Sequence, residues 1–90
     1  MEFITERNRV VYVAEGKELA HVTFPGDGEV VEIDHTFVDD SLRGQGIAGK
    51  LMERAAQSLR DTNRRAKLTC SYAQKWFGDR PEWSDVLTCD

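Results

Sequence analysis

A glycine-rich nonapeptide at residues 43–51, RGQGIAGKL, constrains the fold more than any other feature of the chain. Its glycines satisfy the dinucleotide fingerprint G-x-G-x-x-G, and its Gly-Lys pair satisfies the first seven positions of the Walker A loop, G-x-x-x-x-G-K. Its first six residues, RGQGIA, also fit a third diphosphate-binding pattern, [RQ]-x-x-G-x-[GA]. The three patterns belong to different folds, so the sequence on either side of the loop must decide between them.

The sequence before the loop has the character of an antiparallel meander. Residues 9–14 (RVVYVA) and 19–24 (LAHVTF) predict two strands, and EGKE at 15–18 predicts the hairpin turn between them. Residues 3–6 are expected to add an edge strand. After the turn signal PGDG, residues 29–38 (EVVEIDHTFV) predict one continuous strand. Its alternation assigns Val31, Ile33, His35 and Phe37 to one face, and Glu32, Asp34 and Thr36 to the other.

After the loop the hydrophobic period changes from that of a strand to that of a helix. An apolar stripe that includes Ile47, Leu51 and Leu59 predicts one amphipathic helix over residues 47–63, and the basic residues 64–67 are expected to close it. The next segments predict a strand at 67–71 (KLTCS) and a short helix at 72–77 that ends at Gly78. The aromatic residues Trp76, Phe77 and Trp83 are expected to cover the core, and Val86 and Leu87 to fold back onto it.

This order predicts a single α+β domain over residues 1–90: an antiparallel meander, one long helix and one further strand. The strand before the loop and the strand after the helix form a single crossover, so we expect the two to run parallel.

The surrounding residues exclude two of the three loop patterns. A Walker A loop needs Ser or Thr after its lysine to bind magnesium, and here that position is Leu51 on the apolar face of the helix. A dinucleotide site needs an acidic residue at the end of the next strand, and no Asp or Glu occurs between Asp61 and Asp79. The length also leaves no room for a doubly wound sheet.

The third pattern requires a strand, a glycine turn and an amphipathic helix that begins inside the motif, and all three are predicted. Glycines let the backbone approach a diphosphate, with N–H groups from about Gln45 to Ala48 and a guanidinium fork from Arg43. The alternative is that the glycines only make a tight connection. Glycine costs roughly 1 kcal/mol in a helix, which makes that alternative the weaker one.

Three features indicate a family resemblance: the motif HTFVDDSLRGQGIAGKL at 35–51, the helix after it and the cysteine in LTCSY at 68–72. In these features the chain resembles the short single-domain branch of the GNAT-type N-acetyltransferases. The resemblance implies a GNAT-like fold and acetyl-CoA as the cofactor. It implies that the backbone of Thr36, Phe37 and Val38 pairs with the pantetheine arm. With the loop, the implied cofactor contacts are Thr36, Phe37, Val38, Arg43, Gly44, Gln45, Gly46, Ile47, Ala48, Gly49 and Lys50.

The resemblance also implies catalytic residues. A strand histidine and a cysteine of the following strand flank the thioester in the short branch, and these map onto His35 and Cys70. Tyr72 maps onto the acid that protonates the leaving thiolate in larger members. From the residues alone, a histidine at the edge of the core is the favoured interpretation of His35. Cys70 could equally be a small packed residue, because no basic residue adjoins it to lower its pKa.

Charge and composition limit the partners. A formal net charge of −4 and a pI of about 5.1 argue against a general nucleic-acid binder. Cys70 and Cys89 have neither the number nor the spacing of a disulfide framework or a zinc site, so we expect no metal and a reducing, cytoplasmic location. No apolar run has the length of a signal core or a membrane span, and we expect a monomer or weak homodimer without a membrane partner.

The predicted function is acetyl transfer from acetyl-CoA to an amine of a small molecule or a protein. The alternative is a module that binds CoA or acyl-CoA without efficient transfer, since 90 residues leave few loops to build an acceptor pocket. A third possibility is a small interaction protein in which the loop is only a connection.

Overall fold

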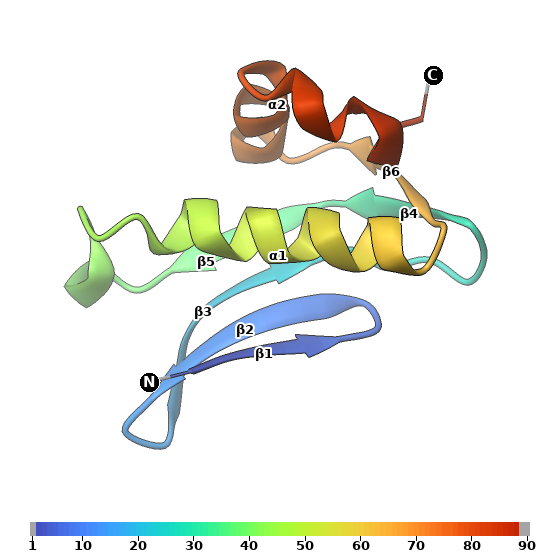
Figure 1. Cartoon of the computed structure of the whole chain (residues 1–90). Coiled ribbons are helices and arrows are strands. Elements are labelled where there is room, and N and C mark those ends of the chain that lie inside the picture. Colours follow the sequence, from blue (N-terminus) through green and yellow to red (C-terminus); the bar gives the residue numbers. More distant parts are fainter. Residues whose placement is uncertain (1, 89–90) are drawn as a thin grey trace.

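The computed structural model describes residues 2–88 and consists of two small sheets and one long helix (Figure 1). Cys89 lies outside the described residues. In chain order the elements are β1 (Glu2–Glu6), β2 (Arg9–Ala14), β3 (Lys17–Thr23), β4 (Val30–Ile33), β5 (His35–Val38), the 3-10 turn η1 (Asp40–Leu42), α1 (Ile47–Asp61), β6 (Arg65–Leu68), α2 (Ser71–Gly78) and the 3-10 turn η2 (Pro81–Val86). One sheet has the order β1-β2-β3-β5, and β4 pairs with β6 in the other. The α+β class is therefore confirmed.

The meander forms as the sequence predicts. β1, β2, β3 and β5 pair antiparallel along the whole sheet. Glu15 and Gly16 form the two-residue turn between β2 and β3, with φ of 54° and 76°. Positive φ at both positions is typical of the hairpin turn whose twist matches the strands, and glycine adopts it without strain.

The prediction of one continuous strand over residues 29–38 is wrong, because the strand breaks at Asp34. The carbonyl of Ile33 accepts the N–H groups of Thr69 and Cys70 at 3.1 Å each, which holds β4 beside the segment that follows β6. One residue later, the N–H of Asp34 donates to the carbonyl of Thr23 at 3.3 Å, and its carboxylate accepts the Thr23 hydroxyl at 2.6 Å. Consecutive residues are thus held by different sheets, and β4 separates from β5.

The break also reverses the predicted alternation of faces. Val31 and Ile33 are buried, at 2% and 0% exposure, as expected. His35 and Phe37 are exposed, whereas Thr36 and Val38 are half-buried on the core side. The predicted common face of Val31, Ile33, His35 and Phe37 is therefore wrong, because the extra residue at the break changes the parity of the strand.

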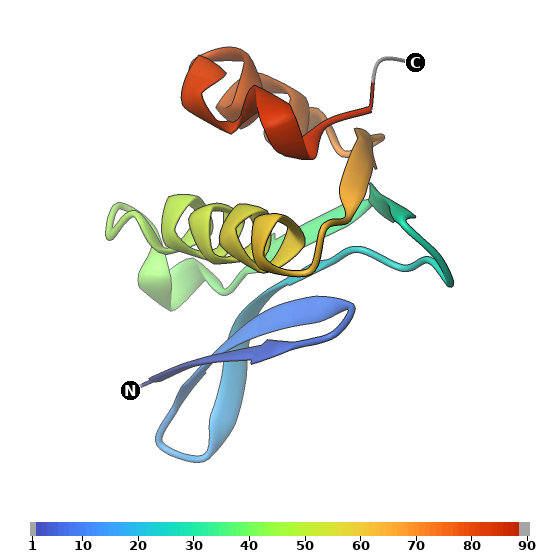
Figure 2. The ribbon, with the colours of Figure 1, turned by 45° about the vertical axis from the view of Figure 1, so that its right-hand side comes forward.

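α1 supplies the centre of the core. Its buried stripe packs on β2 and β3, and in both views it lies between the β1–β2 hairpin and the α2 segment (Figures 1 and 2). The helix ends at Asp61, two residues before the predicted end. Asn63 adopts φ 56° and the N–H of Arg64 donates to the carbonyl of Leu59 at 2.8 Å, which is the glycine-type helix stop with asparagine in the left-handed position.

The segment after α1 differs in detail from the prediction. Residues 64–67 do not close the helix: Arg64 is buried at 4% exposure, and β6 begins at Arg65. β6 runs parallel to β4, which confirms the predicted crossover, but it ends at Leu68. Cys70 is therefore not a strand residue and instead precedes α2 as its N-cap. The predicted cover of the core by Trp76, Phe77 and Trp83 is confirmed, and Val86 and Leu87 lie on the core through η2 and a bridge between Ala66 and Leu87.

Candidate functional site

The glycine loop turns the chain from β5 into α1 with two left-handed glycines. Asp39 starts the turn: its carboxylate accepts the Ser41 N–H at 3.0 Å and the Ser41 hydroxyl at 2.6 Å, and these hydrogen bonds hold the pKa of Asp39 below its ordinary value. Gly44 and Gly46 follow with φ of 81° and 72°. Within residues 2–88, no atom lies within 4 Å of where a Cβ would stand at either position. Glycine is needed there for the backbone conformation, and the space above the loop stays open.

The loop leaves the N-terminus of α1 without an internal partner. Among residues 2–88 no side chain caps it and its first turn carries no acidic residue. The N–H groups of Ile47, Ala48 and Gly49 precede the first helical hydrogen bond, from Lys50 to the carbonyl of Gly46 at 3.2 Å. Together with the helix dipole they form a group of donors suited to an anion.

β5 presents a free backbone edge beside these donors. The N–H of Asp39 donates to the carbonyl of Leu19 at 2.8 Å, in register with the pairing of Phe37 with His21. In an antiparallel pair, the intervening residues direct their N–H and C=O groups to the other side. Thr36 and Val38 therefore point these groups away from β3, and no strand among the described residues lies there.

A pocket of about 220 Å³ joins the free edge to the loop and to α2. Val38, Ile47 and Ala48 line it, and Tyr72 contributes from α2. Gly49 lies where α1 faces α2: a Cβ there would make ordinary contacts with the Trp76 indole nitrogen at 3.5 Å and the Tyr72 hydroxyl at 3.8 Å. An extended ligand with an anionic group fits this arrangement, with its chain along β5 and its charge at the start of α1.

The predicted charged contacts lie at the rim of this pocket. Arg43 forms an ion pair with Asp40 at 3.1 Å, and both side chains are at least 80% exposed. Gln45 donates its side-chain amide to the carbonyl of Ser41 at 3.5 Å, so it supports the loop. Lys50 is exposed on the first turn of α1.

Of the predicted catalytic residues, Tyr72 lines the pocket and Cys70 lies against Thr36 of β5. The Cys70 sulfur and the Thr36 hydroxyl are 3.5 Å apart, within hydrogen-bonding distance. Burial raises the pKa of the Tyr72 phenol above its ordinary value, with Cys70 adding to the rise and the charge of Arg80 opposing it. The phenol is thus protonated near neutral pH and has a proton to donate.

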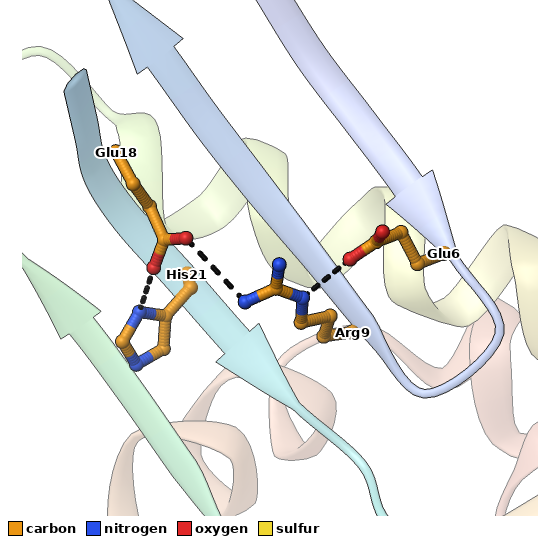
Figure 3. A network of polar contacts seen from close by, with 4 residues as sticks. All are labelled: Glu6, Arg9, Glu18 and His21. Atoms are coloured by element: carbon orange, nitrogen blue, oxygen red, sulfur yellow. Dashed lines mark hydrogen bonds and ion pairs between the residues drawn. The ribbon is translucent and has the colours of Figure 1, made fainter.

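The structure does not bring His35 to Cys70. His35 lies on the outer face of the four-stranded sheet, where its ring centroid is 5.6 Å from that of His21. The His21 ring also lies 5.5 Å from that of Phe37, and its Nδ1 is 2.8 Å from a carboxylate oxygen of Glu18. Figure 3 shows Glu18 between His21 and Arg9, with Arg9 continuing the network to Glu6. Sequence reasoning missed this network of four residues because they come from three different strands, β1, β2 and β3.

Apart from Tyr72, sequence reasoning missed the contribution of α2 and of the residue Arg80 that follows it. Trp76 and Arg80 line a second pocket, of about 190 Å³, on the other side of Gly46 and Gly49. The two glycines are shared by both pockets. The only sequence signal was the helical spacing of Tyr72, Trp76 and Arg80, which does not reveal what the helix faces.

Among the residues described, no helix has the length and apolar character required to cross a membrane.

Comparison with known proteins agrees with this geometry. The NMR structure of a GCN5-like protein from Staphylococcus aureus superposes with a TM-score of 0.76 at 29% identity, over 97% of this chain and 87% of that one. The ribosomal-protein-S18-alanine N-acetyltransferase of Escherichia coli superposes with a TM-score of 0.67 at 17% identity, over 84% and 53% of the chains. The Mycobacterium tuberculosis protein Rv2747, solved in complex with CoA, gives 0.65 at 19% identity over 82% and 47%. The two latter similarities concern the fold alone.

Curated relatives match a shorter segment. Protein NATD1 of chicken and of mouse is 38% identical over 52 residues, which is 58% of this chain and 47% of each relative. The aligned segment thus spans about half the length of these relatives. The family model for GCN5-related N-acetyl-transferase matches residues 9–86, which include every strand except β1, the glycine loop, α1 and α2. The chain belongs to the GCN5-related N-acetyl-transferase family.

Proposed function

We propose that the protein binds acetyl-CoA and transfers its acetyl group to an amine. One observation carries the proposal: the donors at the start of α1 and the free edge of β5 face the same pocket. CoA has the matching features, a diphosphate and an extended pantetheine arm with amide groups. A free strand edge can hydrogen-bond such an arm as it would another strand.

The residues present fit this ligand. The N–H groups of Ile47, Ala48 and Gly49 would hold the diphosphate, and within the described chain no carboxylate in the first turn of α1 competes for them. Thr36 and Val38 would pair with the amides of the pantetheine arm. Phe37 directs its side chain outward, so its part in binding is through the backbone position alone.

The chemical step needs a positioned thioester, a proton for the departing sulfur and an acceptor for the proton that the amine loses, and this chain offers groups for the first two. The nitrogen of a neutral amine forms a bond to the thioester carbon as the carbon–sulfur bond breaks; the sulfur takes up a proton, and the nitrogen releases one to solvent. The Tyr72 hydroxyl would supply the proton for the sulfur, because its raised pKa keeps the phenol protonated near neutral pH. The Thr36 hydroxyl and the Cys70 thiol would orient the thioester from the end of β5. Because direct attack by the amine needs no acyl-enzyme, we assign Cys70 a positioning role.

Two measurements test the proposal in sequence. Isothermal titration should detect acetyl-CoA binding and no binding of ATP or NAD. Release of free CoA thiol should then rise when small amines or lysine peptides are added. Binding without acceptor-dependent release across a broad amine panel would favour the alternative of a CoA-binding module. Absence of binding would refute both functions and leave the loop as a connection.

The proposed setting is a reducing, cytoplasmic one. Cys70 is a free cysteine in the described part of the chain, 3.5 Å from the Thr36 hydroxyl, and an oxidising compartment would expose this thiol to modification.

A further inference from the structure

The pocket on the far side of Gly46 and Gly49 has the character of a second anion site. Gly46, Gly49, Lys50, Glu53, Trp76 and Arg80 line it. No residue of β5 lines it, whereas Val38 lines the first pocket, and the two pockets meet at the two glycines. A ligand that passes over the start of α1 can therefore extend from one pocket into the other.

Trp76 contributes a donor that lacks an acceptor. Its side chain is 5% exposed, yet its indole N–H makes no hydrogen bond to any residue in the range 2–88. The nitrogen lies 3.5 Å from where a Cβ on Gly49 would stand, which places it beside the free N–H groups of the first turn. Among the described residues only an Arg64 nitrogen is a buried polar side-chain atom without a partner, so the indole N–H of Trp76 reaches the surface of the pocket, where it can donate to a ligand.

Two cations without acidic partners flank this donor. Arg9, Arg43 and Arg60 each have a carboxylate within 4.0 Å, whereas in the described chain Lys50 and Arg80 have none. Arg80 is held in place by stacking over the Trp76 ring at 4.5 Å and by donation to the Trp76 carbonyl at 3.2 Å. Glu53 is the one carboxylate in the lining, so the cations outnumber it in a protein whose net charge is −4.

We propose that Trp76, Arg80 and Lys50 bind the ribose 3′-phosphate of the coenzyme. This inference rests on the proposed function, in which the diphosphate occupies the start of α1 and the pantetheine arm follows β5. The nucleotide end must then leave on the opposite flank, where the next anionic group of CoA is its 3′-phosphate. A guanidinium, an ammonium and an indole N–H are all donors to phosphate oxygens.

The test compares CoA with 3′-dephospho-CoA, which lacks only this phosphate, by isothermal titration. Wild-type protein should bind CoA roughly tenfold or more tightly than dephospho-CoA. Arg80→Gln should lose most of that preference by weakening CoA binding alone, and Trp76→Phe and Lys50→Gln should do so in part. Lys75→Gln is the matched control, because it removes an exposed cation of α2 that lies outside the pocket lining.

Each other outcome overturns the inference in a recognisable way. Equal affinities of wild-type protein for the two ligands would exclude a 3′-phosphate subsite while leaving the proposed function intact. Equal weakening of both ligands by Arg80→Gln and Lys50→Gln would assign these residues to the diphosphate. Failure of wild-type protein to bind either ligand would refute the proposed function as well. Within residues 2–88 the Lys50 side chain has no ion-pair or hydrogen-bond partner to lose, so its variant tests the inference even if Arg80→Gln disturbs α2.

Discussion

Gly49→Ala should make the free protein more stable and the complex with acetyl-CoA weaker. Gly49 lies in the first turn of α1, where its replacement by alanine gains up to about 1 kcal/mol of helix stability. The new Cβ meets the Trp76 nitrogen at 3.5 Å and the Tyr72 hydroxyl at 3.8 Å, which are ordinary contacts and cause no clash. For a domain of this size, 1 kcal/mol corresponds to a rise in melting temperature of about 4–8 °C.

The same methyl group should hinder the ligand, because Gly49 lines both pockets. An extra methyl in a closely packed site costs about 1–3 kcal/mol, which is a roughly 5- to 150-fold loss of affinity. Differential scanning calorimetry gives the melting temperature, and isothermal titration gives the affinity for acetyl-CoA. Gly78→Ala is the control: it also adds a methyl to a helix, at an exposed position with open space around it, and should leave affinity unchanged. A Gly49→Ala protein that binds acetyl-CoA as tightly as wild type would refute the assignment of the two pockets.

Three further predictions concern the loop, the acid and the fold. Gly46→Glu should abolish the rise in melting temperature caused by acetyl-CoA, because it places a carboxylate among the N–H donors of α1. Gly16→Glu is the control: it bears the same left-handed backbone strain, about 1–2 kcal/mol, in an open turn away from the loop, and it should keep the rise in melting temperature. Tyr72→Phe should lower kcat about 10²- to 10⁴-fold with acetyl-CoA affinity unchanged, measured by CoA release, and full activity would exclude the phenol as the acid. The hydrogen bond from Arg60 lowers the pKa of Asp85. The ionised carboxylate therefore stabilises the fold at pH values above the ordinary pKa of aspartate, which is about 4, and this stabilisation is lost as the pH falls below that value. Asp85→Asn should therefore reduce the free energy of unfolding near pH 7 and flatten its decline below about pH 4, and denaturant melts that show an unchanged pH profile would contradict this.

The sequence predicts those parts of the fold that local signals determine. The turn at Glu15 and Gly16, the apolar stripe of α1 and the crossover from β4 to β6 each follow from neighbouring residues or from general rules of topology. For the glycine loop, Leu51 and the missing acidic residue exclude the Walker A and dinucleotide patterns, so a diphosphate site of the third pattern stays a prediction.

The break at Asp34 could not be predicted, because its cause lies elsewhere in the chain. The alternation through residues 29–38 is unbroken in sequence. What separates the strands is the competition between the carbonyl of Thr23, which binds Asp34, and the N–H groups of Thr69 and Cys70, which bind Ile33. A register change of one residue then moved His35 to the outer face.

The position of Cys70 was missed for a similar reason. KLTCS has strand composition, but the side-chain amide of Gln74 donates to the carbonyl of Leu68 at 2.8 Å and its N–H to the carbonyl of Cys70 at 3.0 Å. These bonds start α2 early and leave Cys70 as its N-cap. The free indole N–H of Trp76 has no signature in sequence at all, since it depends on what α1 places beside α2.

The free edge of β5 has a consequence for how the protein behaves in concentrated solution. An unpaired row of backbone N–H and C=O groups is a template for any extended polypeptide, including the same segment of a second molecule. The groups of Thr36 and Val38 that receive a pantetheine arm in the proposed complex are the ones through which two copies would adhere. Bound coenzyme would then block self-association through this edge, and the protein would be more soluble when its ligand is present than when it is absent.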